Sequence, residues 1–166
     1  PRARTWGPAE MRNPHRSEVY HTWGEMSMPE LDTGRTALAE MVAVDYGDAP
    51  IDPFGLERSI PEVRKMVREI ANTKLDSGKR TIPFIIGGGH ALMFPDAAGV
   101  VDVYGKGKVA VIHFDAHADY STADFGRLVT HGNPVRRLVQ EGLVKPEHII
   151  QVGLRGPTST DLETLD

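Results

Sequence analysis

Short apolar runs alternate along this chain with segments of helical periodicity, and this alternation constrains the fold more than any other feature. Such strands and helices form right-handed crossovers and a parallel sheet covered by helices on both faces, so the predicted fold class is α/β. Ligands of such a sheet bind beyond the carboxyl ends of its strands. The predicted strands are Met41–Val44, Thr81–Ile86, Lys108–Phe114 and His148–Leu154. The predicted helices follow Ser59, span 91–103 and span 135–141.

The helix boundaries carry signals of their own. Ser59–Glu62 has the spacing of a capping box with proline near the first helical position, and Asp76–Gly78 is predicted to end this helix. Asn133 followed by Pro134 is typical of an N-cap that opens a helix, and Gly142 is its predicted stop.

The 166 residues are enough for one domain with a hydrophobic core. Residues 1–40 have weak periodicity and are predicted to be an amino-terminal arm, with one short helix near Pro8–Arg16. Residues 41–166 are predicted to be the amino-terminal part of a single α/β domain. The first residue is not methionine and the end has a helical pattern without a stop signal, so we expect a segment of a longer protein.

The charge and the amino-acid composition favour a small-molecule partner. A formal net charge of -4 and a pI near 6.0 predict no nucleic-acid or anionic-membrane partner. No apolar run approaches the roughly 20 residues that cross a bilayer. The chain has no cysteine, which excludes disulfides and thiolate metal ligands and is consistent with a cytoplasmic protein.

A candidate metal site follows the third predicted strand. Asp115, His117 and Asp119 alternate after the apolar run Val109–Ile112. Side chains two residues apart in extended backbone project to the same side, so these three are predicted to converge as the strand ends. An imidazole suits a transition metal and carboxylates can bridge two divalent ions, which favours Mn, Ni, Fe or Zn over Ca. The competing interpretation is a polar turn that caps a helix.

His90 is the predicted fourth ligand. It follows the strand Thr81–Ile86 as Asp115 follows the next strand, and the carboxyl ends of parallel strands meet at one edge of a sheet. The glycine run Gly87–Gly89 is alternatively a phosphate cradle, but it lacks the Lys-Ser/Thr of a P-loop and the spacing of a dinucleotide motif.

These motifs resemble, in the same order, those of the ureohydrolases, the superfamily of arginase and agmatinase. The resemblance rests on Gly87–His90, Asp115–Asp119 and His131–Pro134. It extends to Val44–Asp48 and Ile150–Gly156, which are similar to bacterial agmatinases, guanidinobutyrases and guanidine hydrolases more than to arginases.

The resemblance implies a three-layer α/β/α fold with a mostly parallel sheet, incomplete in this chain. It implies two divalent metal ions, with manganese as the first expectation and nickel as the alternative. His90, Asp115 and Asp119 would hold one ion, and His117 with a bridging Asp115 would hold the other. His131 matches the family's histidine that shuttles protons or contacts substrate.

The implied enzyme is an amidinohydrolase, in which a metal-bridging hydroxide attacks a guanidinium carbon. Its substrate would be agmatine, a guanidino acid or guanidine, and its products urea and an amine or ammonia. A guanidinium is a poor electrophile, so its hydrolysis needs a strong nucleophile, which metal coordination supplies by lowering the pKa of water toward about 7. Carboxylates offset the repulsion between the ions and a cationic substrate. The resemblance also implies homo- or hetero-oligomers.

Two features depart from the family pattern. Gly89 stands where the family usually has aspartate and Ala91 where it usually has serine, so a partner that would orient His90 is absent. The family's later Asp-x-Asp pair and glutamate do not occur before Asp166, so this chain alone is expected to be inactive.

The alternative function is a non-catalytic partner subunit that keeps the ureohydrolase fold and has lost metal ligands. A zinc deacetylase fits less well, because tandem histidines are absent. Tyr120 and Asp124 are further candidates for substrate contact, with a solvated loop as the competing interpretation.

Overall fold

The computed structural model of the chain describes residues 8, 34, 43–52, 54–122 and 129–156. The backbone divides into two compact units, residues 1–48 and 49–166, and the elements below all belong to the second. Apart from residues 8 and 34, the predicted arm and its boundary at residue 40 lie outside the described residues. They stay predictions.

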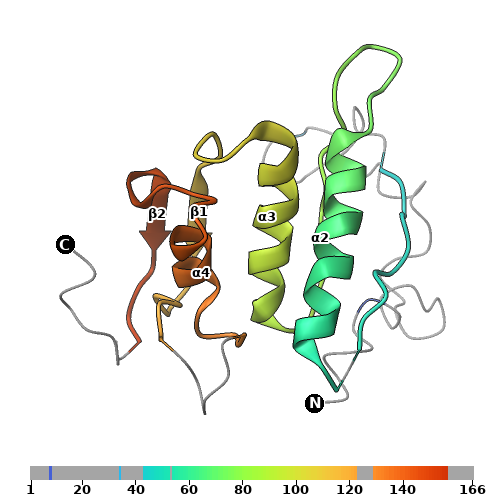
Figure 1. Cartoon of the computed structure of the whole chain (residues 1–166). Coiled ribbons are helices and arrows are strands. Elements are labelled where there is room, and N and C mark those ends of the chain that lie inside the picture. Colours follow the sequence, from blue (N-terminus) through green and yellow to red (C-terminus); the bar gives the residue numbers. More distant parts are fainter. Residues whose placement is uncertain (1–7, 9–33, 35–42, 53, 123–128, 157–166) are drawn as a thin grey trace. The chain divides into compact units, whose positions relative to one another are not determined.

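Helices and two parallel strands form the described part of the second unit (Figure 1). Strands β1 and β2 pair in parallel, with Val111 opposite Ile149 and His113 opposite Gln151. The predicted α/β fold with parallel strands is confirmed. In chain order the elements are helix α2 (Leu56–Asn72), the 3-10 turn η1 (His90–Leu92), helix α3 (Met93–Tyr104), strand β1 (Val111–Phe114), helix α4 (Pro134–Gln140), the 3-10 turn η2 (Pro146–His148) and strand β2 (Ile149–Val152).

The hydrophobic core lies between the strand pair and the helices α3 and α4. Val111 and Ile149 pack against this core from one face of the strands. Alternate residues of both strands face the other way and are exposed, so helices cover one face of the strand pair within the described residues. The second covering layer that the sequence predicts is not among these residues. The core side chains are Phe94, Ala98, Val101, Leu138, Leu143 and Val144.

Helix α2 lies alongside α3 through a close contact at Gly99 (Figure 1). A methyl group at Gly99 would lie 2.8 Å from the carbonyl oxygen of Arg64 and 2.8 Å from the Cβ of Val67. Arg64 also donates two hydrogen bonds to Asp102, at 2.8 and 2.7 Å, and thereby holds the pKa of that carboxyl below its usual value. The two helices are therefore joined by close packing and by an ion pair.

The predicted capping box at Ser59 is wrong. Helix α2 begins earlier, at Leu56, and the Ser59 hydroxyl accepts a hydrogen bond from the Asp52 backbone N–H at 2.8 Å. The hydroxyl thus ties the preceding loop to the helix, and Pro61 lies inside α2. The helix ends at Asn72, before the predicted stop signal.

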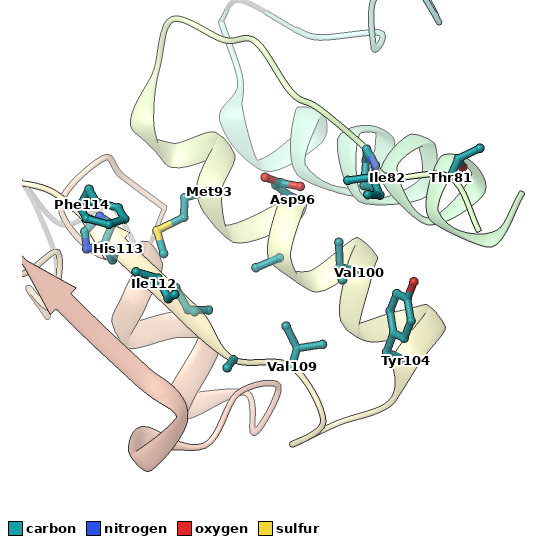
Figure 2. A pocket seen from close by; sticks show the side chains of 14 residues that line it. Thr81, Ile82, Met93, Asp96, Val100, Tyr104, Val109, Ile112, His113 and Phe114 are labelled. Atoms are coloured by element: carbon teal, nitrogen blue, oxygen red, sulfur yellow. The ribbon is translucent and has the colours of Figure 1, made fainter. Parts of the chain in front are cut away.

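The predicted strand Thr81–Ile86 is not a strand in the structure. Ile82 and Phe84 are 89% and 88% exposed, and Pro83 between them has no N–H to donate to a ladder. This segment, α3 and β1 line a cleft of about 480 Å³ (Figure 2). The predicted strand Met41–Val44 is likewise wrong in its described part, since residues 43 and 44 form no strand.

The other helices and strands predicted between residues 91 and 154 are confirmed with shifted ends, as expected for boundaries read from sequence. The short helix predicted near Pro8–Arg16 lies almost entirely outside the described residues. Asn133 is the N-cap residue of α4, but its side-chain oxygen accepts a hydrogen bond from Thr130 N–H rather than from the helix. None of the helices in the described part of the chain combines the length and the apolar character needed to cross a bilayer.

Candidate metal centre

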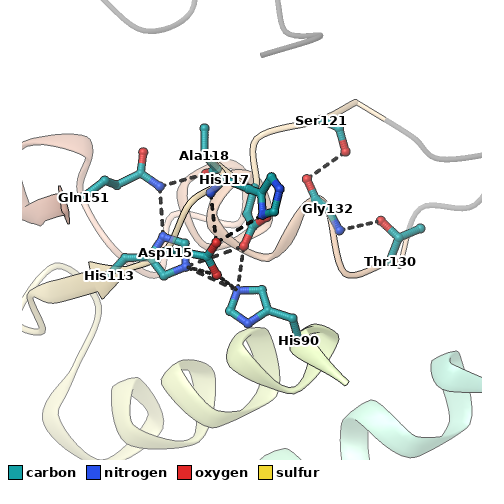
Figure 3. Close-up of polar contacts among 10 residues, drawn as sticks. His90, His113, Asp115, His117, Ala118, Ser121, Thr130, Gly132 and Gln151 are labelled. Carbon is teal, nitrogen blue, oxygen red and sulfur yellow. Dashed lines mark hydrogen bonds and ion pairs between the residues drawn. The ribbon is translucent and has the colours of Figure 1, made fainter. Parts of the chain in front are cut away.

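Four side chains meet at the carboxyl end of β1 (Figure 3). His90 comes from the turn η1 that precedes α3, His113 from β1 itself, and Asp115 and Asp119 from the loop that follows β1. One ligand atom from each residue lies within 4.8 Å of the corresponding atoms of the other three. We call these four residues the His2Asp2 cluster. Because they come from separate elements of the unit, only the folded chain assembles the cluster.

The imidazole nitrogens of the cluster point at its carboxylate oxygens. His90 Nε2 lies 2.6 Å from Asp119 Oδ2 and 3.8 Å from Asp115 Oδ2. His113 Nε2 lies 3.5 Å from Asp119 Oδ2 and 3.7 Å from Asp115 Oδ2. The four groups therefore surround one point.

The backbone turns sharply at Asp119. Its φ of 53° lies in the left-handed region, which aspartate tolerates better than most residues. The Asp119 carbonyl accepts a hydrogen bond from the Arg136 N–H of α4 at 3.3 Å, and Ser121 N–H donates to the Gly132 carbonyl at 3.0 Å. These bonds hold the loop after β1 against the start of α4. Backbone strain of this kind is concentrated at functional sites.

The surroundings of the cluster shift the pKa values of three of its members. The short contact with Asp119 raises the pKa of His90, against the effect of burial. Burial lowers the pKa of His113, whose side chain is only 6% exposed. A hydrogen bond from the His117 backbone N–H, at 2.9 Å, lowers the pKa of Asp115 and favours its ionised form.

The residues present fit a metal ion. Asp119 Oδ2 is buried and accepts no hydrogen bond of normal geometry, although His90 Nε2 lies beside it. An unsatisfied buried carboxylate oxygen is costly, and a bound cation is one way to satisfy it. Two imidazoles with two carboxylates suit Mn, Fe, Ni or Zn.

The structure places the predicted ligand His117 outside the His2Asp2 cluster. Its side chain is 67% exposed, and its Nδ1 lies 3.2 Å from Asp115 Oδ1 (Figure 3). Gly156 packs closely against the ring, since a methyl group there would lie 2.6 Å from His117 Cδ2. His117 thus contacts Oδ1 of Asp115, whereas His90 and His113 face Oδ2 of the same carboxylate. The role of His117 as a ligand stays a prediction.

His131 lies on the turn that precedes α4 and is exposed. This turn contacts the loop after β1, because the Gly132 carbonyl also accepts a hydrogen bond from the Ser121 hydroxyl at 2.7 Å. The proton-transfer role of His131 stays a prediction. Of the two weaker candidates, Asp124 lies outside the described residues, and the Tyr120 ring lies 5.5 Å from the Arg136 guanidinium.

The sequence pattern does not single out His113 as a site residue, because His113 lies within a predicted strand. The alternation that selects Asp115 nevertheless extends back to it. Its partner Gln151 was missed as well: its amide Nε2 lies 3.0 Å from His113 Nδ1 and donates to the Ala118 carbonyl at 2.8 Å.

The sequence profile of the arginase family matches residues 3–166. Guanidinopropionase of Pseudomonas aeruginosa is 32% identical over 155 residues, which are 90% of this chain and 42% of that protein. The chain spans 34% to 48% of the length of the curated relatives it matches.

Two solved structures have a similar backbone. Proclavaminate amidinohydrolase from Streptomyces clavuligerus has a TM-score of 0.58 and 31% identity, over 69% of this chain and 37% of that chain. A variant of Trypanosoma cruzi formiminoglutamase, solved with manganese, has a TM-score of 0.59 and 25% identity, over 72% of this chain and 37% of that chain.

Proposed function

Because this chain belongs to the arginase family, as its motifs predicted, we propose that it is the amino-terminal part of a metal-dependent amidinohydrolase. The proposed substrate is a small cationic guanidino compound: agmatine, a guanidino acid or guanidine. The proposed products are urea and an amine or ammonia. Relatives named agmatinase, guanidinopropionase and guanidino acid hydrolase support this substrate class. The observation that carries the proposal is the convergence of the His2Asp2 cluster on one point.

In this proposal His90, Asp115 and Asp119 hold one ion, with manganese expected first and nickel as the alternative. The buried, unsatisfied Oδ2 of Asp119 supports this assignment. His117 would hold a second ion together with a bridging Asp115, which its contact at 3.2 Å supports. The bound ions would supply a nucleophile from water at neutral pH.

The remaining chemistry is proposed for the chain's own side chains. The carboxylates of Asp115 and Asp119 would attract the guanidinium cation and offset its repulsion from the metal ions. His131 would deliver a proton to the leaving amine, a general-acid role that histidine side chains often have. The bonds between its turn and the loop after β1 support this role. Oligomer formation and a cytoplasmic location also remain predictions.

The second candidate is a non-catalytic partner subunit. Two observations favour the partner subunit. Gly89 lacks the family's carboxylate beside His90, and His117 is exposed. Metal analysis separates the candidates, because a hydrolase of this family is expected to bind about two ions per chain.

The proposed function is tested by measuring urea release from agmatine, 4-guanidinobutyrate and guanidine with added Mn²⁺ or Ni²⁺. The 166-residue chain is expected to be inactive, and a longer protein that carries this sequence is expected to be active. Urea release by the 166-residue chain at the rate of the longer protein would contradict the proposed incomplete site. Absence of both bound metal and urea release in the longer protein would favour the partner subunit.

His117→Ala in the longer protein tests the second ion. The variant should bind less Mn²⁺ per chain and release urea more slowly. His148→Ala is the matched control, since His148 lies in η2 outside the cluster. Unchanged metal content in His117→Ala would remove His117 from the ligand set.

A further inference from the structure

We infer that Gln151 is a positioning residue that keeps the proton of His113 on Nε2, so that His113 donates toward the carboxylates of the cluster and is not a metal ligand. The inference rests on the proposed function, because it concerns the residues proposed to hold the ion. It divides the His2Asp2 cluster into three ligands and one supporting imidazole.

Gln151 and His113 form a pair across the two strands. His113 and Gln151 are opposite each other in the parallel register of β1 and β2, and both side chains face the helix side of the strands. Gln151 Nε2 lies 3.0 Å from His113 Nδ1 and 2.8 Å from the Ala118 carbonyl oxygen (Figure 3). One amide nitrogen therefore contacts both the imidazole and the loop after β1.

The Ala118 carbonyl fixes the orientation of the Gln151 amide. A backbone carbonyl only accepts hydrogen bonds, so the amide must present its nitrogen, not its oxygen, to Ala118. The amide nitrogen carries two protons, and the one not donated to Ala118 is available to His113 Nδ1. His113 Nδ1 is consequently the acceptor in this pair.

The orientation of the Gln151 amide in turn fixes the tautomer of His113. A neutral imidazole has one protonated and one unprotonated nitrogen, so an accepting Nδ1 leaves the proton on Nε2. Nε2 faces the oxygens of Asp119 and Asp115 at 3.5 and 3.7 Å. A protonated nitrogen has no lone pair for a metal ion, whereas an N–H directed at carboxylates helps to orient them.

His90 differs from His113 in this respect. Its Nε2 is the imidazole nitrogen nearest to the unsatisfied Oδ2 of Asp119, at 2.6 Å. Within the described part of the chain, no glutamine amide forms a hydrogen bond with His90. A contact like that of Gln151 with His113 therefore does not hold the proton on Nε2 of His90. The geometry thus selects His90 as the ligand and His113 as its support.

The experiment begins with the unmodified full chain, without metal. Long-range ¹H–¹⁵N correlation spectra report which imidazole nitrogen of His113 carries the proton, and a His113→Asn sample assigns the signal. The expected result is a proton on Nε2. A proton on Nδ1 would overturn the inference. Because the tautomer is measured on the unmodified chain, the result does not depend on whether a Gln151 variant folds.

The second part compares Gln151→Leu with Gln140→Leu, the matched control on the exposed end of α4. Gln151→Leu should lose the strict preference for the Nε2 tautomer and bind Mn²⁺ about 10- to 100-fold more weakly, as is typical when a partner of a metal ligand is lost. Gln140→Leu should match the unmodified chain. An unchanged tautomer and affinity in Gln151→Leu would contradict the positioning role.

Zn²⁺, which is diamagnetic, then tests the ligand assignment directly. The Nε2–H signal of His113 should persist in the zinc-bound chain, while the His90 nitrogens shift. Loss of the His113 proton on zinc binding would make His113 a ligand and overturn the inference. Failure of the proposed function looks different, because no ion would bind and the tautomer would still be measurable.

Discussion

His90 and Asp119 belong to segments on either side of β1, and their side chains meet with Nε2 2.6 Å from Oδ2. The oxygen is buried and otherwise unsatisfied, so a metal ion beside it would gain a preformed anionic ligand. Asp119→Asn should therefore weaken Mn²⁺ binding by more than about 100-fold, beyond the effect of losing an outer partner. Isothermal titration calorimetry of the chain with Mn²⁺ measures this change.

The control for this variant is Asp76→Asn, which removes the same charge from an exposed position. Its affinity for Mn²⁺ should equal that of the unmodified chain. Equal affinities of Asp119→Asn and Asp76→Asn would show that Asp119 is not a ligand.

Gly99→Ala should destabilise the fold. The added methyl group would lie 2.8 Å from a backbone oxygen of α2, which cannot move without shifting the helix. Forcing atoms into a packed contact costs about 1–3 kcal/mol, so the free energy of unfolding in urea should fall by that amount. Gly89→Ala is the control: its backbone is extended, with φ of -115°, and no atom lies within 4 Å of the new methyl group. Similar losses in both variants would exclude a specific clash at Gly99.

Asp96 should make stability depend on pH. Burial at the start of α3 raises the pKa of this carboxyl to about 6, so its ionisation opposes folding. The folded state binds the proton more tightly than the unfolded state, so the contribution of Asp96 is most favourable below about pH 4 and is lost as the pH rises through 6. Asp96→Asn should therefore be more stable than the unmodified chain at pH 8, by up to roughly 3 kcal/mol.

The measurement for Asp96→Asn is urea unfolding of both chains at several pH values between 4 and 8. The difference in stability should shrink as the pH falls through 6. A difference that does not change with pH would mean that the carboxyl does not titrate in this range.

Three of the cluster residues could be predicted because their signals are local in the sequence. His90 and Asp115 each follow an apolar run, and Asp119 lies close after the second one. Alternation alone does not explain their convergence, since β1 ends at Phe114 and Asp119 turns into the left-handed region. Side chains two residues apart project to the same side only where the backbone is extended. The backbone leaves that conformation after β1, and His117 therefore lies outside the cluster although it belongs to the same alternating series.

The pair formed by His113 and Gln151 could not be predicted in the same way. Their contact depends on the register between β1 and β2, which are separated in the chain by α4 and η2. The segment Thr81–Ile86 shows the opposite failure: its composition favours a strand, but a strand requires a hydrogen-bonded neighbour, and the described residues supply none for it. Local pattern predicts which residues suit a sheet, whereas pairing depends on the whole chain.

Gly89→Asp should strengthen metal binding. The position precedes His90, its backbone is extended, and no atom lies within 4 Å of an added Cβ, so a side chain can begin here without a clash at its Cβ. A further negative charge near the His2Asp2 cluster attracts a divalent cation, and at a separation of several ångströms in solvent this favours binding by roughly 2- to 10-fold. Gly89→Asn is the matched control, because it adds a side chain of the same size without the charge. Calorimetry with Mn²⁺ should give a tighter complex for Gly89→Asp than for Gly89→Asn, with a difference that decreases in high salt. Equal affinities of the two variants would mean that the absent carboxylate does not limit metal binding in this chain, and the departure at Gly89 would then no longer favour the partner subunit.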